Sequence, residues 1–145
     1  MSNSDSQLLT AQNDSSPTLI IEGLTDQLAI LRYFETINAG DFEATGLLFA
    51  SEGAMYPPFE SPVVGPTAIS TFLQAEAQGM QLQPKQGLVE SLADDQTQVR
   101  VSGKVQTALF GVNVSWQFVL NAEGLIVSAV VKLLASPEQL LQLKG

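Results

Sequence analysis

The apolar residues of the chain follow two different periods, one in each half. Between residues 26 and 79 they recur about every 3.6 positions, as in helices with one buried face. From residue 86 onward they alternate with polar residues, as in strands that bury one side. Helices followed by strands predict an α+β fold. We expect three helices on the concave side of a curved antiparallel sheet.

Local signals set the expected helix boundaries. Three helices are predicted, at residues 26–38, 42–49 and 66–79. Thr25 is a suitable N-cap for the first helix, and Gly40 is placed to end it. Asp41 is expected to cap the second helix. The third is expected to begin after Gly65, with Pro66 in its first turn.

Four strands are predicted in the second half, at residues 86–92, 99–107, 112–120 and 125–134. Their short connections favour an antiparallel meander. The proline-rich segment 56–62 is expected to be a sheet edge or a shaped loop. Ser136 and Pro137 predict a short C-terminal helix. Residues 1–17 are polar and predict a flexible tail, which leaves residues 18–145 as one domain.

Composition excludes several classes of function. The net charge of −9 disfavours binding to nucleic acid. The absence of Cys excludes disulfides and thiolate chemistry, and the absence of His removes the commonest general base and metal ligand. We therefore expect no catalytic residue and no metal site. No signal peptide or membrane span is recognisable, so a cytoplasmic protein is expected.

Two aromatic residues with polar groups remain as candidates for function. Tyr33 lies beside the apolar stripe of the first helix, and Trp116 lies on the inward face of a strand. Each carries a hydrogen-bond donor that needs an acceptor once it is buried. Either each donates to a backbone carbonyl in the core, or both point at one acceptor supplied by a ligand. Periodicity alone leaves both interpretations open.

Five short segments carry a more specific pattern. They are YFETINAGDF (33–42), GAMYPPF (53–59), GKVQT (103–107), WQF (116–118) and LLASP (133–137). In this order, from about residue 21 to the end, they resemble the C-terminal domain of the cyanobacterial orange carotenoid protein family. The chain is similar to the free-standing homologues of that domain. The resemblance implies the cone-shaped fold of nuclear transport factor 2.

The resemblance also implies a ligand and a site. The family binds a keto-carotenoid, typically canthaxanthin or echinenone, whose keto oxygen would accept hydrogen bonds from Tyr33 and Trp116. Residues expected to line the cavity are Ile37, Phe49, Leu82, Val105, Thr107, Leu109, Phe110, Val131 and Leu133. One departure concerns the rim, because the full-length proteins of the family carry a second Trp where Leu109 stands. Glu76 aligns with a Glu that pairs with an Arg of the helical domain in the family.

A carrier function follows from this resemblance. A carotenoid is a rod on the order of 30 Å long, whereas a domain of this size has a radius of gyration of roughly 14–15 Å. We therefore expect a homodimer that shares one carotenoid. The expected acceptors are helical carotenoid proteins, and uptake would involve transient membrane contact near the thylakoids. Quenching of singlet oxygen, and hence photoprotection, would follow from the pigment.

Two other functions fit the same fold. An isomerase or dehydratase acting on a small apolar substrate would need a carboxylate inside the pocket. Glu35 and Asp41 are expected near the mouth, but the inward stripes show no acid. The other alternative is a protein-binding module that dimerises through the open face of the sheet.

Overall fold

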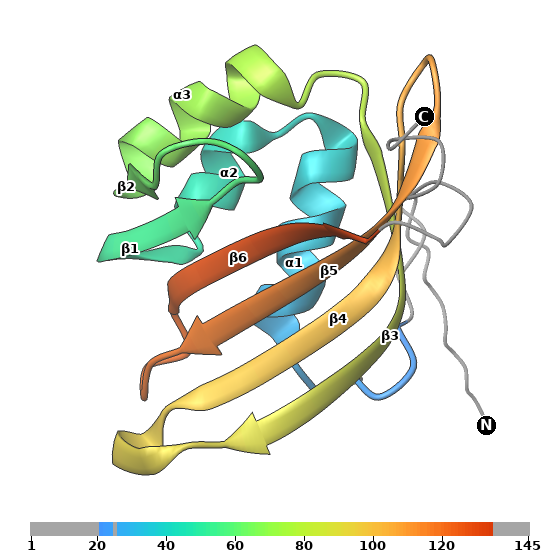
Figure 1. The fold of residues 1–145 in the computed structure, drawn as a ribbon. Coiled ribbons are helices and arrows are strands. Elements are labelled where there is room, and N and C mark those ends of the chain that lie inside the picture. Colours follow the sequence, from blue (N-terminus) through green and yellow to red (C-terminus); the bar gives the residue numbers. More distant parts are fainter. Residues whose placement is uncertain (1–20, 25, 135–145) are drawn as a thin grey trace, which may run out of the picture.

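The computed structural model describes residues 21–24 and 26–134 (Figure 1). Its helices are α1 (Leu28–Ala39), α2 (Phe42–Gly46) and α3 (Pro66–Glu76), with a short 3-10 turn, η2, at Ala93–Asp95. Its strands are β1 (Phe49–Tyr56), β2 (Val63–Val64), β3 (Gln81–Ser91), β4 (Thr97–Gln106), β5 (Gly111–Leu120) and β6 (Ile126–Leu134). The expected tail at 1–17 and the expected C-terminal helix lie outside the described residues.

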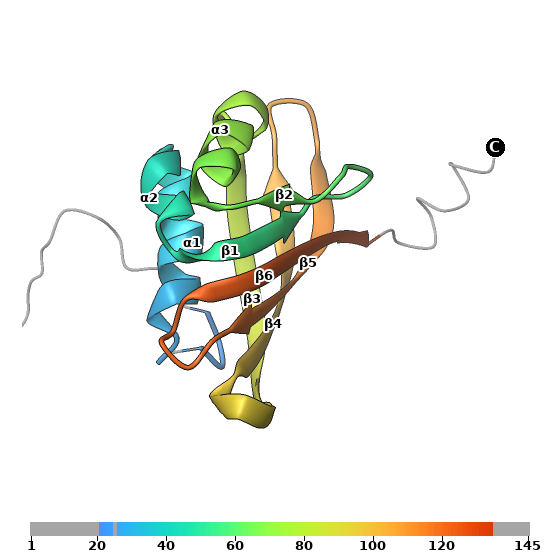
Figure 2. The same ribbon diagram turned by 90° about the vertical axis from the view of Figure 1, so that its left-hand side faces the viewer.

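The strands form one six-stranded sheet in the order β2-β1-β6-β5-β4-β3. Strands β3 to β6 are an antiparallel meander, as the alternation predicts. The expectation of a wholly antiparallel sheet is wrong, because β1 pairs with β6 in parallel. All three helices lie on one side of the curved sheet (Figure 2). The predicted α+β plan is confirmed.

The first helix buries the face that its periodicity predicts. Ile30, Tyr33 and Phe34 are at most 2% exposed. The helix ends at Gly40, whose φ of 75° is the left-handed conformation that glycine adopts at low cost. The expected cap at Thr25 is wrong, because the helix begins at Leu28 with Gln27 as N-cap. Before the helix, the N–H of Leu24 donates to the carbonyl of Ile21 at 3.0 Å and the N–H of Gln27 donates to that of Leu24 at 3.4 Å.

The other two helices begin where expected and end early. Asp41 caps α2, since its Oδ1 accepts a hydrogen bond of 3.3 Å from the backbone N–H of Ala44. This helix stops at Gly46, and Phe49 starts strand β1 instead of ending the helix. The third helix begins at Pro66, after Gly65, and stops at Glu76.

Two strand segments escaped prediction because they are irregular. In β1 the pairing with β6 shifts between Phe49 and Ala54, so burial does not alternate. Gly53 lies in this bulge, and a Cβ there would lie 2.5 Å from the carbonyl oxygen of Ile126. The first half of β3 contains Pro84, and the pairing with β4 shifts between Pro84 and Gln86. A bulge at an edge strand tolerates proline.

The end of α1 is tied to the edge strand β3 by one side chain. The Asn38 Nδ2 donates to the carbonyl of Leu82 at 2.9 Å, and the Leu82 N–H donates to Oδ1 of Asn38 at 2.7 Å. The Asn38 amide thus pairs with Leu82 as a neighbouring strand would. It fixes α1 against the sheet where the strand enters the core.

Replacing this amide tests the connection. Asn38→Ala removes both hydrogen bonds and leaves a partly buried backbone pair without partners, so the free energy of unfolding should fall by about 2 kcal/mol. Chemical denaturation measures the change. Asn113→Ala, at an exposed position of β5, is the matched control and should change stability by less than about 0.5 kcal/mol. Equal effects of the two substitutions would contradict the role of Asn38.

Candidate functional site

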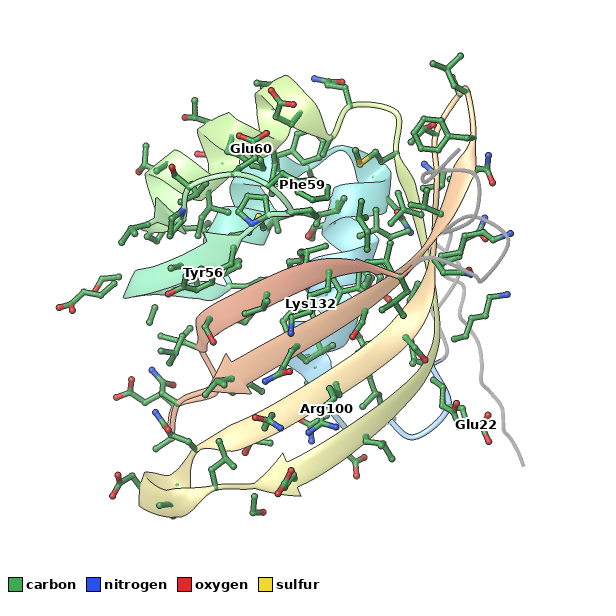
Figure 3. The ribbon with its side chains drawn as sticks, in the orientation of Figure 1. Glu22, Tyr56, Phe59, Glu60, Arg100 and Lys132 are labelled. Atoms are coloured by element: carbon green, nitrogen blue, oxygen red, sulfur yellow. The ribbon has the colours of Figure 1, made fainter. Side chains whose placement is uncertain are left out.

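A cavity of about 310 Å³ lies between the helices and the concave face of the sheet. Its walls come from α1, α3, the loop between β1 and β2, and the inward faces of β3 to β6. This volume is at the lower end of the range of small-molecule sites. The mouth is bounded by the β1–β2 loop, the end of α3 and the β4–β5 hairpin. Figure 3 shows the side chains of these elements, with Phe59 and Glu60 of the β1–β2 loop labelled.

Tyr33 borders the cavity from α1 and is 2% exposed. Its ring is surrounded by aromatic rings, with centroids at 4.9 Å for Phe118, 5.2 Å for Phe34 and 6.4 Å for Phe49. Burial raises the pKa of the Tyr33 hydroxyl above its ordinary value. The hydroxyl is therefore neutral and able to donate a hydrogen bond throughout the physiological pH range.

Trp116 borders the same cavity from the opposite layer, at the middle of β5, and is also 2% exposed. Its ring meets that of Phe34 edge to face, with centroids 4.8 Å apart. The backbone pairs with Val101 on one side and Val131 on the other. Both neighbours are apolar, so the indole N–H is the polar group of this part of the sheet's inner face.

Neither donor has a protein acceptor among residues 21–24 and 26–134. No hydrogen bond of these residues involves the Tyr33 hydroxyl or the Trp116 indole N–H. A buried donor without an acceptor costs about 1–3 kcal/mol. Most buried polar groups are paired, so two unpaired donors on one cavity call for an explanation. An acceptor atom placed in the cavity would supply it. Within the described part of the chain, neither group donates to a backbone carbonyl.

Most residues predicted to line the cavity border it. They are Ile37, Leu82, Val105, Thr107, Phe110, Val131 and Leu133. Two predicted lining residues do not. Phe49 is 3% exposed and packs beside the Tyr33 ring, which separates it from the void. Leu109 is 88% exposed at the tip of the β4–β5 hairpin, because the short hairpin turns it outward.

Other lining residues were not predicted, for two reasons. They are Met55, Pro57, Pro58, Glu60, Phe72, Leu73, Glu76, Ala77, Met80, Val112 and Val114. The residues of α3 lie on one helical face, so the spacing of Phe72, Leu73 and Glu76 could have indicated them. Met55 and the two prolines could not be placed, because the bulged strand β1 has no regular pattern.

The carboxylates at the cavity differ from those expected. Glu35, on α1, and Asp41, the N-cap of α2, are not among its lining residues. The acids that border it are Glu60 and Glu76, and both are exposed. Among the described residues no cluster of three or more Asp or Glu side chains could hold a metal ion. No helix in this part of the chain is long and apolar enough to span a bilayer.

The unpaired hydroxyl predicts an unusual response to mutation. Tyr33→Phe removes a buried donor without leaving a void in the core, so the empty protein should become more stable by about 1 kcal/mol. Tyr56→Phe is the matched control, since Tyr56 is 39% exposed, and it should have no measurable effect. Thermal and chemical unfolding of both variants measure the change in stability. A clear loss of stability in Tyr33→Phe would show that the hydroxyl has a partner.

Comparison with known proteins agrees with this geometry. The orange carotenoid-binding protein of Synechocystis sp. is 42% identical to this chain over 135 residues, which is 90% of this chain and 42% of the relative. The protein of the same name from Limnospira maxima is 42% identical over 127 residues, covering 85% and 40%. The chain thus spans less than half the length of these relatives. The resemblance indicated by the sequence segments is confirmed.

A solved structure gives the same result. The orange carotenoid protein of Anabaena binding canthaxanthin superposes with a TM-score of 0.79 at 41% identity, over 92% of this chain and 44% of that one. Residues 27–131 match the model of the nuclear transport factor 2 (NTF2) domain. This match includes Tyr33, Trp116 and every other residue that lines the cavity except Leu133. The chain therefore belongs to the NTF2 domain family.

Proposed function

We propose that this protein binds one end of a keto-carotenoid, canthaxanthin or echinenone, in the cavity. Tyr33 and Trp116 would donate hydrogen bonds to its terminal keto oxygen. The observation that carries the proposal is a pair of buried donors that border one apolar void and have no acceptor in the described part of the chain. A keto-carotenoid has one acceptor atom at the end of an apolar body, which would match two donors in an apolar cavity.

The apolar walls would supply most of the affinity. Burial of apolar surface contributes roughly 25 cal/mol per Å², whereas each hydrogen bond adds only about 0.5–1.5 kcal/mol. The two hydrogen bonds would therefore fix the depth of the ligand and its colour. The similarity to proteins named orange carotenoid-binding, and to one solved with canthaxanthin, supports this choice of ligand.

Binding is favoured over catalysis by the position of the acids. A general base for an isomerase or dehydratase has to reach its substrate inside the pocket. Glu60 and Glu76, the two carboxylates that border the cavity, are exposed. The buried end of the cavity instead presents two neutral donors, which suits recognition of a carbonyl oxygen.

A homodimer and a carrier role follow from the dimensions. A rod on the order of 30 Å long would extend beyond a cavity of about 310 Å³. A second copy, mouth to mouth, would cover the other end, and a symmetric diketo-carotenoid suits this twofold arrangement. Because the mouth is open, the pigment can be passed on. We propose that the protein takes pigment from membranes in the cyanobacterial cytoplasm and donates it to helical carotenoid proteins, with singlet-oxygen quenching by the bound pigment.

The spectrum of the bound pigment tests the two donors. Protein purified from carotenoid-producing cells should be coloured, and Tyr33→Phe and Trp116→Phe should each shift its absorption to shorter wavelength. The shift is expected because a hydrogen bond at the keto oxygen stabilises the polar excited state of the pigment. Tyr56→Phe serves as control and should keep the original spectrum. An unchanged spectrum in both cavity variants would show that neither residue contacts the oxygen, and a colourless protein would reject the proposal.

Stoichiometry tests the shared ligand. Light scattering combined with absorbance should give one carotenoid for each pair of chains in the loaded protein, and a smaller assembly after pigment extraction. The reason is that the second mouth protects the half of the rod that one cavity leaves in water. A loaded monomer with one pigment would contradict the mouth-to-mouth arrangement.

A further inference from the structure

We infer that the rim of the empty cavity docks on the surface of an electrically neutral lipid bilayer, with Phe59 and Leu109 as the side chains that enter it. The inference rests on the proposed function, because a bilayer is the apolar phase in which such a ligand is dissolved. It adds the surface that makes the contact and the kind of headgroup that this surface accepts.

Both side chains stand at the mouth. Phe59 is 94% exposed on the β1–β2 loop, next to Pro58 and Glu60, which border the cavity. Leu109 is 88% exposed at the tip of the β4–β5 hairpin, next to Phe110, which also borders it. Phe59 and Glu60 lie together on this loop (Figure 3). An apolar side chain thus projects into water from each of two separate sides of the opening.

Local backbone structure, and not packing, sets these positions. Phe59 has a φ of 63°, in the left-handed region that bulky residues rarely adopt. Thr107 shapes the hairpin, since its hydroxyl oxygen accepts from the N–H groups of Leu109 and Phe110 at 3.2 and 3.1 Å. A strained backbone conformation that no core contact compensates is a feature of functional sites.

The form of the rim suits a bilayer. A protein partner recognises an anchor by a complementary pocket around it, with a ring of contacts that excludes water. Isolated side chains on two loop tips need no such pocket in a fluid lipid surface, where aromatic and aliphatic groups enter the interface singly. Insertion at the rim would place the mouth against the hydrocarbon without exposing the ligand to water.

The charges at the rim select the lipid. Glu60 and Glu76 both border the cavity and are exposed, and its described lining contains no Lys or Arg. The whole chain carries a net charge of −9. An anionic lipid surface would repel this face, so neutral headgroups are the expected partner.

Flotation of the pigment-free protein with vesicles tests the contact. Wild type should float with vesicles of pure phosphatidylcholine, and less when an anionic lipid replaces part of it. The double substitution Phe59→Asn and Leu109→Ser should weaken partitioning by on the order of tenfold, because two apolar groups no longer leave water. Leu28→Ser is the matched control, since Leu28 is 72% exposed at the end of α1 opposite the hairpin (Figure 1). It should partition as wild type does.

Pigment uptake separates this inference from the proposed function. Carotenoid offered in detergent micelles should load wild type and the double variant equally, whereas extraction from phosphatidylcholine vesicles should be slower for the variant by a similar factor. If the micelles load neither protein, the proposed function fails, while the flotation result still decides the docking. If wild type does not float, or the variant floats and extracts pigment as wild type does, the inference is overturned. If the double variant binds vesicles as wild type does but no longer forms the pigment-loaded dimer, the rim is a contact between two copies of the chain. That result also overturns the inference.

Discussion

The proposed site depends on two buried donors that have no acceptor among residues 21–24 and 26–134. Tyr33 and Trp116 come from opposite layers, a helix and a strand, yet border one void. Three aromatic rings pack around Tyr33 and one, that of Phe34, packs on Trp116, and no carbonyl or carboxylate of the described residues accepts a hydrogen bond from either group. Pairing these donors inside the protein would have been worth a few kcal/mol. An external acceptor, as proposed for the keto oxygen, would restore this stability.

The fold keeps the void from collapsing. Shifts of register in β1 and β3 increase the local twist, so the sheet curves around the helices instead of lying flat against them. Asn38 holds the end of α1 at the edge strand through two hydrogen bonds with Leu82. Inside α1 and α2, the hydroxyls of Thr36 and Thr45 bond to each other at 2.7 Å and fix the two helices together. These polar contacts act on α1 and α2 in addition to the apolar packing of Ile30, Tyr33 and Phe34 in the core.

The sequence predicted the regular parts of this arrangement and not the irregular ones. Alternation identified the inward faces of β4, β5 and β6, and with them Trp116. Helical periodicity placed Tyr33 beside the buried stripe of α1. Neither pattern shows whether a donor is paired, because pairing depends on residues distant in the chain. Strand β1 was missed since its bulge removes the alternation, and Leu109 was misplaced since hairpin geometry decides which way a loop residue points.

The limited depth of the cavity would affect both the binding and the release of a ligand. A ligand that moves from a bilayer into this cavity exchanges one apolar surrounding for another, so burial alone gives little net preference. In the proposed complex, the pair of hydrogen bonds, together about 1–3 kcal/mol, would favour the protein, and a second copy would cover the protruding half. That cover would be lost whenever the copies separate. A site that held a rigid apolar rod by its end in this way would be suited to passing it on, and less suited to storing it.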